Sequence, residues 1–232
     1  MSNKELSTIP LSKGLEAIIL DFDGTILESN HIKAEAFRNL FKDYPEHGDA
    51  IVALHRARGG MSRFEKFRII HRDIIQKPLD DIEMERLNQG FGRLVEEEII
   101  ACPFVPGARE FLEACSARYH LFIASGTPQD ELQGLVKRRC MNPLFKGVYG
   151  APRDKGQILK DILAENGWAP CQALFIGDAI DDYSGSVEAR VPFIGRTGPD
   201  GANPFSQVKV KLLISDLAEL HRQWTSLTGT SA

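Results

Sequence analysis

The hydrophobic positions along this chain change their periodicity repeatedly, and the changes predict alternating strands and helices. Runs that are continuously apolar are typical of strands buried on both faces of a parallel sheet; they cover 17–20, 121–124, 173–176 and 191–194. A shorter strand is expected at 147–149. Apolar side chains at helical spacing predict helices over 107–118, 128–139, 155–166 and 182–190, and a last strand–helix pair from 211. This alternation predicts an α/β fold, a Rossmann-like parallel sheet with helices on both faces.

A long helical segment interrupts this alternation early in the chain. Between residues 29 and 102 the apolar side chains keep a helical spacing and no strand pattern occurs, with Ser29 or Asn30 as the first N-cap. We therefore predict a core domain of residues 1–28 and 103–232 and an inserted all-α cap domain of residues 29–102. The cap either only stabilises the core or forms a lid over a site.

Composition agrees with this picture and excludes little else. The chain has 232 residues, 43% hydrophobic and 26% charged, which suits one domain with an insertion. Its formal net charge of −4 gives no support for a nucleic-acid partner. We also expect no membrane partner and a cytoplasmic location, because residues 1–14 lack a signal-peptide pattern and no apolar run could span a bilayer. A monomer and a homodimer both remain open.

The four cysteines are widely spaced and form no C-x-x-C pair. This spacing favours reduced thiols in the core of a cytosolic protein over a disulfide framework or a metal cluster. They are Cys102, Cys115, Cys140 and Cys171.

Polar clusters follow the predicted strands, where a parallel α/β sheet places its ligands. The first run ends in Asp21-Phe22-Asp23-Gly24-Thr25, the second in Ser125-Gly126-Thr127, and the third in Gly177-Asp178-Ala179-Ile180-Asp181-Asp182. Lys155 opens a predicted helix. Because the carboxyl ends of parallel strands meet at one edge, we expect these side chains to share one crevice.

These residue types suit the transfer of a phosphoryl group. Asp21 on a rigid strand can act as a nucleophile and bind a hard cation, and Asp23 can act as an acid or base beside it. Carboxylates this close repel one another, so a cation is needed, and an oxygen-only site with Asp178 and either Asp181 or Asp182 favours Mg²⁺.

The remaining members of the clusters would bind the anion itself. The turn at Gly24 and Thr25 can present backbone amides to an anion, while Ser125 and Lys155 can meet phosphoryl oxygens. Each motif alone also has an ordinary alternative, such as a turn, an N-cap or an exposed helix lysine. Their occurrence together, in order and at strand ends, favours a site.

The clusters together resemble the four motifs of the haloacid dehalogenase superfamily, in the branch with a helical cap inserted after the first motif. Asp21 to Thr25 resembles the first motif, Ser125 the second, Lys155 the third, and Gly177-Asp178 with Asp182 the fourth. Lys155 is followed by Gly156, where many members have proline. Within the superfamily the chain is most similar to the phosphoglycolate phosphatase and β-phosphoglucomutase branch.

The resemblance implies a role for each matched residue. Asp21 would attack phosphorus to form an aspartyl-phosphate, and Asp23 would protonate the leaving group and then activate water. Mg²⁺ would be held by Asp21, the backbone carbonyl of Asp23, Asp178 and Asp182. The transferring phosphoryl group would be bound by Ser125 with Gly126, and by Lys155.

Three functions are therefore weighed. The first is a Mg²⁺-dependent phosphatase for a small phosphorylated metabolite, such as a sugar phosphate or phosphoglycolate; Asp23 favours it, because relatives that cleave other bonds generally lack that carboxylate. The second is a phosphosugar mutase, because Gly60-Met61-Ser62-Arg63 is similar to a cap loop whose arginine, here Arg63, contacts a distal phosphate in β-phosphoglucomutases. The third is a catalytically silent binding domain.

The cations of the segment 55–66 have two possible places. They either meet an anionic substrate when the cap closes or form the solvated faces of cap helices. His31 and Lys33, near the start of the cap, are expected to face solvent rather than the substrate.

Overall fold

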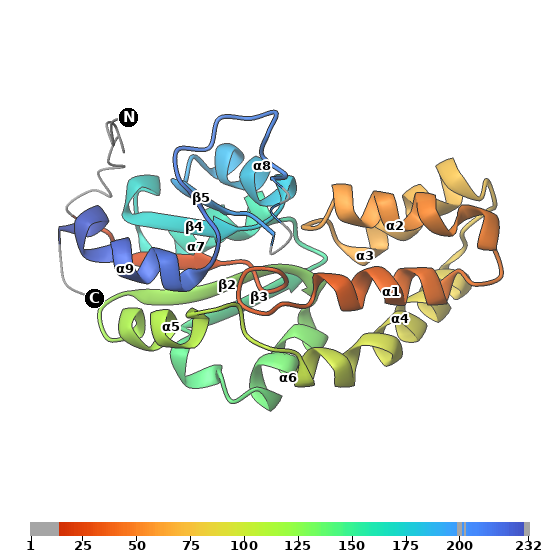
Figure 1. Cartoon of the computed structure of the whole chain (residues 1–232), viewed down its shortest axis with the longest axis horizontal. Helices are drawn as coiled ribbons and strands as arrows, with labels where there is room; N and C mark the ends of the chain where they lie inside the picture. The colour runs from red at the N-terminus through yellow and green to blue at the C-terminus, as the bar shows by residue number, and fades with distance from the viewer. Residues whose placement is uncertain (1–13, 199–200, 202, 230–232) are drawn as a thin grey trace.

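A six-stranded, fully parallel sheet forms the centre of the molecule (Figure 1). The computed structural model describes residues 14–198, 201 and 203–229. The strand order is β3-β2-β1-β4-β5-β6, with bounds β1 Ala17–Leu20, β2 His120–Pro128, β3 Gly147–Ala151, β4 Ala173–Gly177, β5 Phe193–Arg196 and β6 Leu213–Ile214. The first strand is thus central, flanked by β2 and β4. The predicted α/β fold is confirmed.

Helices cover both faces of this sheet, which explains why β1 is apolar at every position. Ile18 and Leu20 face one hydrophobic cluster, whereas Ala17 and Ile19 face the other. The first cluster takes residues from α5 (Ala108–Ser116), α6 (Gln129–Arg138) and α9 (Leu217–Thr228). The second takes residues from α7 (Lys155–Asn166) and α8 (Ile180–Ala189). Successive strand residues point to opposite faces, so both sets have to be apolar.

Helices also occupy the segment between β1 and β2 and extend away from the sheet (Figure 1). They are α1 (Asn30–Leu40), η1 (Pro45–His47), α2 (Gly48–Ala57), α3 (Arg63–Ile69), the π-helical η2 (Ile70–Ile74) and α4 (Asp81–Ala101). The rings of Phe37, Phe67 and Phe91 pack against one another inside this layer. We call these helices the cap. The division of the chain into separate core and cap domains stays a prediction.

The remaining short helices are η3 (Asn142–Leu144) and η4 (Pro170–Gln172). The expectation that all cysteines are core thiols is wrong for two of them. Cys102 and Cys115 are buried, but Cys140 and Cys171 are exposed. Cys140 follows α6 with a positive φ of 56°, in the turn that ends the helix, and Cys171 lies in η4. Among the residues described, no helix combines the length and apolar character needed to cross a membrane.

Candidate active site

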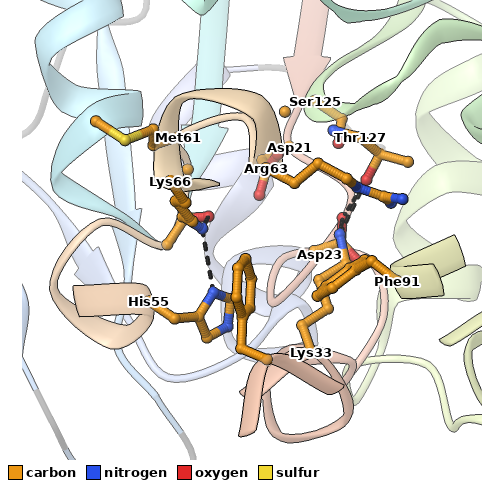
Figure 2. A pocket seen from close by; sticks show the side chains of 14 residues that line it. Asp21, Asp23, Lys33, His55, Met61, Arg63, Lys66, Phe91, Ser125 and Thr127 are labelled. Atoms are coloured by element: carbon orange, nitrogen blue, oxygen red, sulfur yellow. Dashed lines mark hydrogen bonds and ion pairs between the residues drawn. The ribbon is translucent and has the colours of Figure 1, made fainter. Parts of the chain in front are cut away.

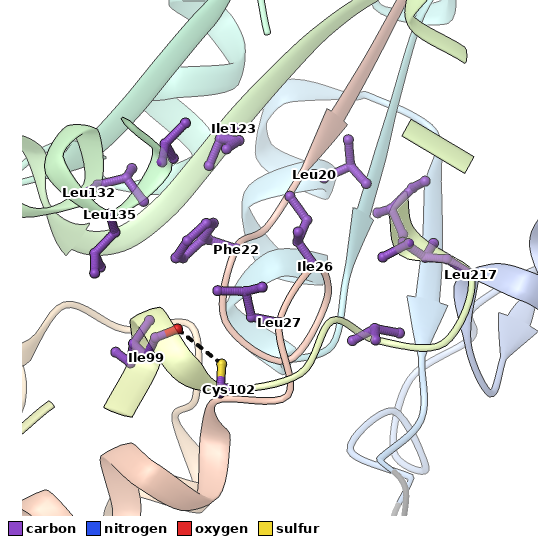
Figure 3. Close-up of a cluster of buried hydrophobic side chains, with 14 of the residues drawn as sticks. Leu20, Phe22, Ile26, Leu27, Ile99, Cys102, Ile123, Leu132, Leu135 and Leu217 are labelled. Carbon is purple, nitrogen blue, oxygen red and sulfur yellow. Dashed lines mark hydrogen bonds between the residues drawn. The ribbon is translucent and has the colours of Figure 1, made fainter. Parts of the chain in front are cut away.

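The apolar side chains of the first motif and the residues after it anchor this segment in the core. Phe22 is fully buried and points into the cluster that also contains Ile26 and Leu27 (Figure 3). Asp21 is tied to the neighbouring strand, because its backbone amide donates to the carbonyl of Ile176 (2.9 Å). With Phe22 in the core, Asp21 and Asp23 line the cavity at the carboxyl edge of the sheet.

Lys155 contacts two of the predicted carboxylates. Its Nζ donates to Oδ1 of Asp21 (2.8 Å) and also contacts Oδ1 of Asp182, and its side chain is 5% exposed. The N-cap Asp154 accepts the amide of Gln157 (2.8 Å), so α7 begins where Lys155 can reach the site. Although burial opposes its charge, the carboxylates of Asp182 and Asp21 raise the pKa of Lys155 above its ordinary value. Lys155 is therefore a buried site cation and not an exposed helix residue.

The carboxylates form a compact cluster. Oxygens of Asp21, Asp178 and Asp182 all lie within 4.8 Å of one another. Burial, reinforced by the charges of Asp21 and Asp182, raises the pKa of Asp178 well above its usual range. A bound cation would remove this repulsion, and a donor set made only of oxygen suits a hard ion such as Mg²⁺. The residues present therefore fit a magnesium site.

Neighbouring groups hold these carboxylates in place. Asp178 accepts from Asn30 Nδ2 (2.7 Å) and from Thr25 Oγ1 (3.4 Å), and Asp182 Oδ2 accepts the amide of Ala179 (2.9 Å). Gly24 has φ +78°, and a Cβ there would lie 2.1 Å from Asp178 Oδ2. Only glycine combines this conformation with so close a carboxylate.

At the start of α8, the adjacent aspartates Asp181 and Asp182 have different partners. Asp182 points into the cluster, whereas Asp181 accepts from Arg58 of the cap through Nε (3.0 Å) and Nη2 (2.8 Å). Asp182 is also the residue that the motif resemblance matches to the fourth motif.

Asp23 is surrounded by donors of its own. Ser29 Oγ donates to Oδ1 (2.7 Å), while Thr127 Oγ1 (3.0 Å) and Lys33 Nζ contact Oδ2. Burial favours the neutral acid. The charge and hydrogen bond of Lys33, together with the hydrogen bonds of Ser29 and Thr127, nevertheless lower the pKa of Asp23. Asp23 is not a member of the three-carboxylate cluster.

The expectation that Lys33 faces solvent is wrong. Its side chain is 12% exposed and contacts both Asp23 and Thr127 (2.9 Å to Oγ1). Ser29 occupies the N-cap position of α1 but spends its hydroxyl on Asp23 and not on the helix. Residues 29 and 33 are one helical turn apart, so their spacing was a usable signal that both face the same side. His31 is exposed, as expected.

A small cavity of about 20 Å³ lies between the cap and these residues, enough for a water molecule. Figure 2 shows the Asp23–Lys33 pair and the His55–Lys66 pair on different sides of it. His55, Arg63 and Lys66 are buried and line the cavity, so they do not form a solvated helix face, whereas Arg56 is exposed. Their contact with a substrate stays a prediction.

The other predicted anion-binding residues are placed unequally. Ser125 and Gly126 line the cavity, and Ser125 Oγ accepts the amide of Thr127 (3.1 Å). Gly24 and Thr25 are not among its lining residues. The Gly24 carbonyl instead accepts from Arg196 Nη1 (2.6 Å), a buried arginine in β5 that the sequence reasoning missed.

Arg63 enters the cavity from α3. Its Nη2 donates to Glu131 Oε1 (2.5 Å) on α6 and its guanidinium lies 4.4 Å from the centre of the Phe91 ring. Nη1 is buried and has no hydrogen-bond partner among the residues that the structure describes.

Comparison with known proteins agrees with this geometry. A phosphoglycolate phosphatase from Synechococcus elongatus is 25% identical over 181 residues, which are 72% of this chain and 77% of that protein. A phosphorylated carbohydrates phosphatase from Thermotoga maritima is 28% identical over 136 residues, or 56% of this chain and 59% of that protein. A predicted phosphoglycolate phosphatase from Haemophilus somnus has the same fold, with a TM-score of 0.71 at 21% identity, covering 90% of this chain and 98% of that one.

The family model of the haloacid dehalogenase-like hydrolases matches residues 15–190. This stretch begins two residues before β1 and ends one residue after α8. This stretch contains all four polar clusters together with the cap. The chain therefore belongs to the haloacid dehalogenase-like hydrolase family.

Proposed function

We propose that this protein is a Mg²⁺-dependent phosphatase that hydrolyses a small phosphorylated metabolite, a sugar phosphate or a phosphoglycolate-like acid, through an aspartyl-phosphate. The observation that carries the proposal is the buried Lys155, which contacts Asp21 and Asp182 beside Asp178. Asp23 lies at the same cavity with its own set of donors. The names of the two curated relatives support the same reaction.

In the first half of the reaction, a carboxylate oxygen of Asp21 forms a bond to phosphorus and the ester oxygen leaves. Asp23 is ionised beside Lys33, so it first has to part from Lys33 and take up a proton, which it then gives to that oxygen. Ser125 and Lys155 donate to the transferring phosphoryl oxygens, whose charge needs fixed donors.

In the second half, Asp23 takes a proton from a water molecule that attacks phosphorus. The bond between Asp21 and phosphorus breaks, which restores the Asp21 carboxylate and releases inorganic phosphate. The lowered pKa of Asp23 keeps this carboxylate ionised, which is the form that accepts a proton. Asp21, Asp178 and Asp182 would hold the magnesium ion, which supplies positive charge that offsets the carboxylates and the phosphoryl oxygens. All motif carboxylates are present, which argues against a silent binding domain.

A phosphosugar mutase is the second candidate, and the small size of the cavity favours it. A space of about 20 Å³ under the cap restricts water, and transfer to a sugar hydroxyl requires such restriction. The two reactions differ in their product: a phosphatase releases inorganic phosphate, whereas a mutase returns an isomeric sugar phosphate.

The test is phosphate release from a panel of phosphorylated metabolites, with Mg²⁺ or EDTA, for the wild type, Asp21→Asn and Asp23→Asn. We expect Mg²⁺-dependent release, a loss of at least about 10³-fold in Asp21→Asn, and a loss of about 10²- to 10⁴-fold in Asp23→Asn. Asp49→Asn, whose side chain is 96% exposed on the cap, is the matched control and should keep full activity.

Two results would contradict the proposal. Release that survives Asp21→Asn would remove the aspartyl-phosphate, and no release from any compound would remove the phosphatase. In the second case, conversion of sugar 1-phosphates into 6-phosphates is the assay that separates the mutase from a silent domain.

A further inference from the structure

Lys66 is a buried cation on the cap side of the cavity that has no anionic partner among the described residues. It lies on α3 and its side chain is buried. Its Nζ is 3.1 Å from His55 Nδ1, 3.2 Å from the carbonyl of Gly59 and 5.7 Å from the centre of the Phe37 ring. All of these partners are neutral.

The other cations near the carboxylates are paired differently. Lys33 contacts Asp23, Arg63 contacts Glu131, and Lys155 contacts Asp21 and Asp182. The acidic groups close to the cavity are thereby committed to other cations. An anionic partner for Lys66 would therefore have to come from a bound molecule.

An unpaired buried ammonium is costly, and the titration of this pair reflects that cost. Burial, with the charge of Lys33, lowers the pKa of Lys66 to about 7, and burial with the charge of Lys66 lowers the pKa of His55 to about 2. His55 is therefore a neutral acceptor for the ammonium. A bound anion would hold Lys66 in its charged form.

Arg63 supplies an independent observation at the same cavity. It lies one helical turn before Lys66 and is 4% exposed. Glu131 uses Nη2, whereas Nη1 is buried without a hydrogen-bond partner. Two donors from one face of α3 are thus unsatisfied by anionic groups of the described chain, and both line the space above Asp21.

We propose that Lys66 is a specificity residue that binds a second anionic group of the substrate, on the part that is not transferred. This inference rests on the proposed function and narrows its substrate class. The substrate would be a small phosphate ester that also carries a carboxylate or a second phosphate, in place of a sugar with a single phosphate. Both groups offer the charged oxygen acceptors that Lys66 and Arg63 Nη1 lack.

Binding of phosphonates tests this inference, because their carbon–phosphorus bond is not an ester and binding can be measured without turnover. The probes are propylphosphonate, 3-phosphonopropionate and propane-1,3-diphosphonate, which share a three-carbon chain and differ in the far group. Titration calorimetry would use the wild type with Mg²⁺, Lys66→Met and Lys66→Arg. Lys42→Met replaces an exposed lysine of the cap and is the matched control.

In the wild type we expect at least one doubly anionic probe to bind about 10-fold or more tightly than propylphosphonate, the effect of about one charge-assisted contact. Lys66→Met should abolish this preference and leave propylphosphonate binding within about 2-fold. Lys66→Arg should retain part of the preference, and Lys42→Met all of it. A comparison of the affinities of the two doubly anionic probes then shows whether the site prefers a carboxylate or a second phosphate.

Proton uptake gives a second readout that a structural role would not produce. At pH 8 the free Lys66 is mostly neutral, so an anion that binds it should draw a proton from the buffer, and Lys66→Met should remove this uptake. The charged groups that act on Lys66 from other elements stay in place in that variant: Lys33, Asp23, Asp181 and Lys155, with His55 in contact.

The outcomes separate this inference from the proposed function. Equal affinity for all three probes in the wild type, or a preference that persists in Lys66→Met, would overturn the role of Lys66 even if phosphate release is observed. Conversely, the predicted preference without any phosphate release would retain the anion site and contradict the phosphatase. Circular dichroism and melting of each variant exclude a folding defect, and Lys66→Arg provides the charged replacement if Lys66→Met does not fold.

Discussion

Two buried lysines show how strongly single residues depend on their neighbours. Lys155 contacts two carboxylates, which raise its pKa, whereas Lys66 has neutral partners and its pKa falls to about 7. Lys155 is the first residue of α7 and Lys66 the middle residue of α3. Lys66 lines the cavity, and Lys155 contacts Asp21, which also lines it. The sequence singled out Lys155 at the start of a helix and Lys66 only as one of several cap cations, but in both cases the partner decides the charge state.

Lys66→Met should stabilise the protein at neutral pH. Below about pH 7 Lys66 is charged in both the folded and the unfolded state, so the folded state bears the full cost of the buried charge. As pH rises from about 7 towards 10.5, the folded lysine loses its proton first and that cost disappears.

Thermal melting between pH 6 and 10 measures this effect. The variant should exceed the wild type by at least about 1 kcal/mol at pH 6 to 7, or about 2–4 °C in Tm, with the difference shrinking towards pH 10. Lys42→Met should show no such trend, because Lys42 is exposed. A lower Tm of Lys66→Met at pH 6 would contradict the assignment of an unpaired buried charge.

At the scale of the elements, the cap and the core meet through a few defined contacts. Arg58 after α2 pairs with Asp181 on α8, and Arg63 on α3 pairs with Glu131 on α6. Between them, the Gly60 carbonyl would lie 2.8 Å from a Cβ at position 126. The small space between the cap and the core depends on these contacts, so we expect the cap to move when a substrate enters.

Arg58→Ala should loosen the cap with little effect on stability. Arg58 is 44% exposed, and such partly exposed pairs contribute about 0–1 kcal/mol. Hydrogen–deuterium exchange at residues 58–62 should become faster, since fewer contacts oppose opening. The control Arg86→Ala breaks an ion pair with Glu83 inside α4 and should leave that exchange unchanged. Equal acceleration in both variants would show that the Arg58 pair does not hold the cap.

Gly126→Ala should impair closure. The added methyl group would lie within 2.8 Å of the Gly60 backbone carbonyl, so the cap loop has to shift outward. We expect kcat/KM for the best substrate to fall about 10-fold or more, because small displacements in a site cost that much. Gly134→Ala on α6, with nothing within 4 Å of its Cβ, should keep full activity and gain up to about 1 kcal/mol of stability. Unchanged activity of Gly126→Ala would place the reaction outside the small cavity.

At the scale of the whole molecule, the parallel sheet brings together residues that are far apart in the sequence. β1 lies between β2 and β4, so Asp21, Ser125 and Asp178 meet at one edge. The cost of this assembly is a group of buried carboxylates that repel one another. We therefore expect folding and cation binding to be coupled.

Magnesium should stabilise the whole protein. A cation that binds only the folded state at about 100 times its Kd contributes about 2.7 kcal/mol, which corresponds to a rise in Tm of about 5–10 °C. Melting curves with excess EDTA and with increasing Mg²⁺ measure it. Asp178→Asn should remove most of the rise and melt higher than the wild type in EDTA, because it relieves the repulsion. A full magnesium response in Asp178→Asn would exclude Asp178 as a ligand.

Much of the fold could be predicted because its signals are local. The helix over 155–166 begins after the N-cap Asp154 and ends at Gly167 with φ +67°, as the pattern indicated. The continuously apolar strands follow from burial on both faces. The sequence also identified the motif carboxylates and Lys155, since each stands at the end of a strand or the start of a helix.

The sequence by itself determined the alternation of elements, the inserted helices and the polar residues at strand ends, because these depend on periodicity and on neighbours in the chain. Only the tertiary structure decided the partners of the charged side chains. It placed Lys33 on Asp23, Asp181 on Arg58 and Lys66 beside a neutral histidine. Such pairings join elements that are distant in the chain, and burial and charge act through space, so no local pattern encodes them.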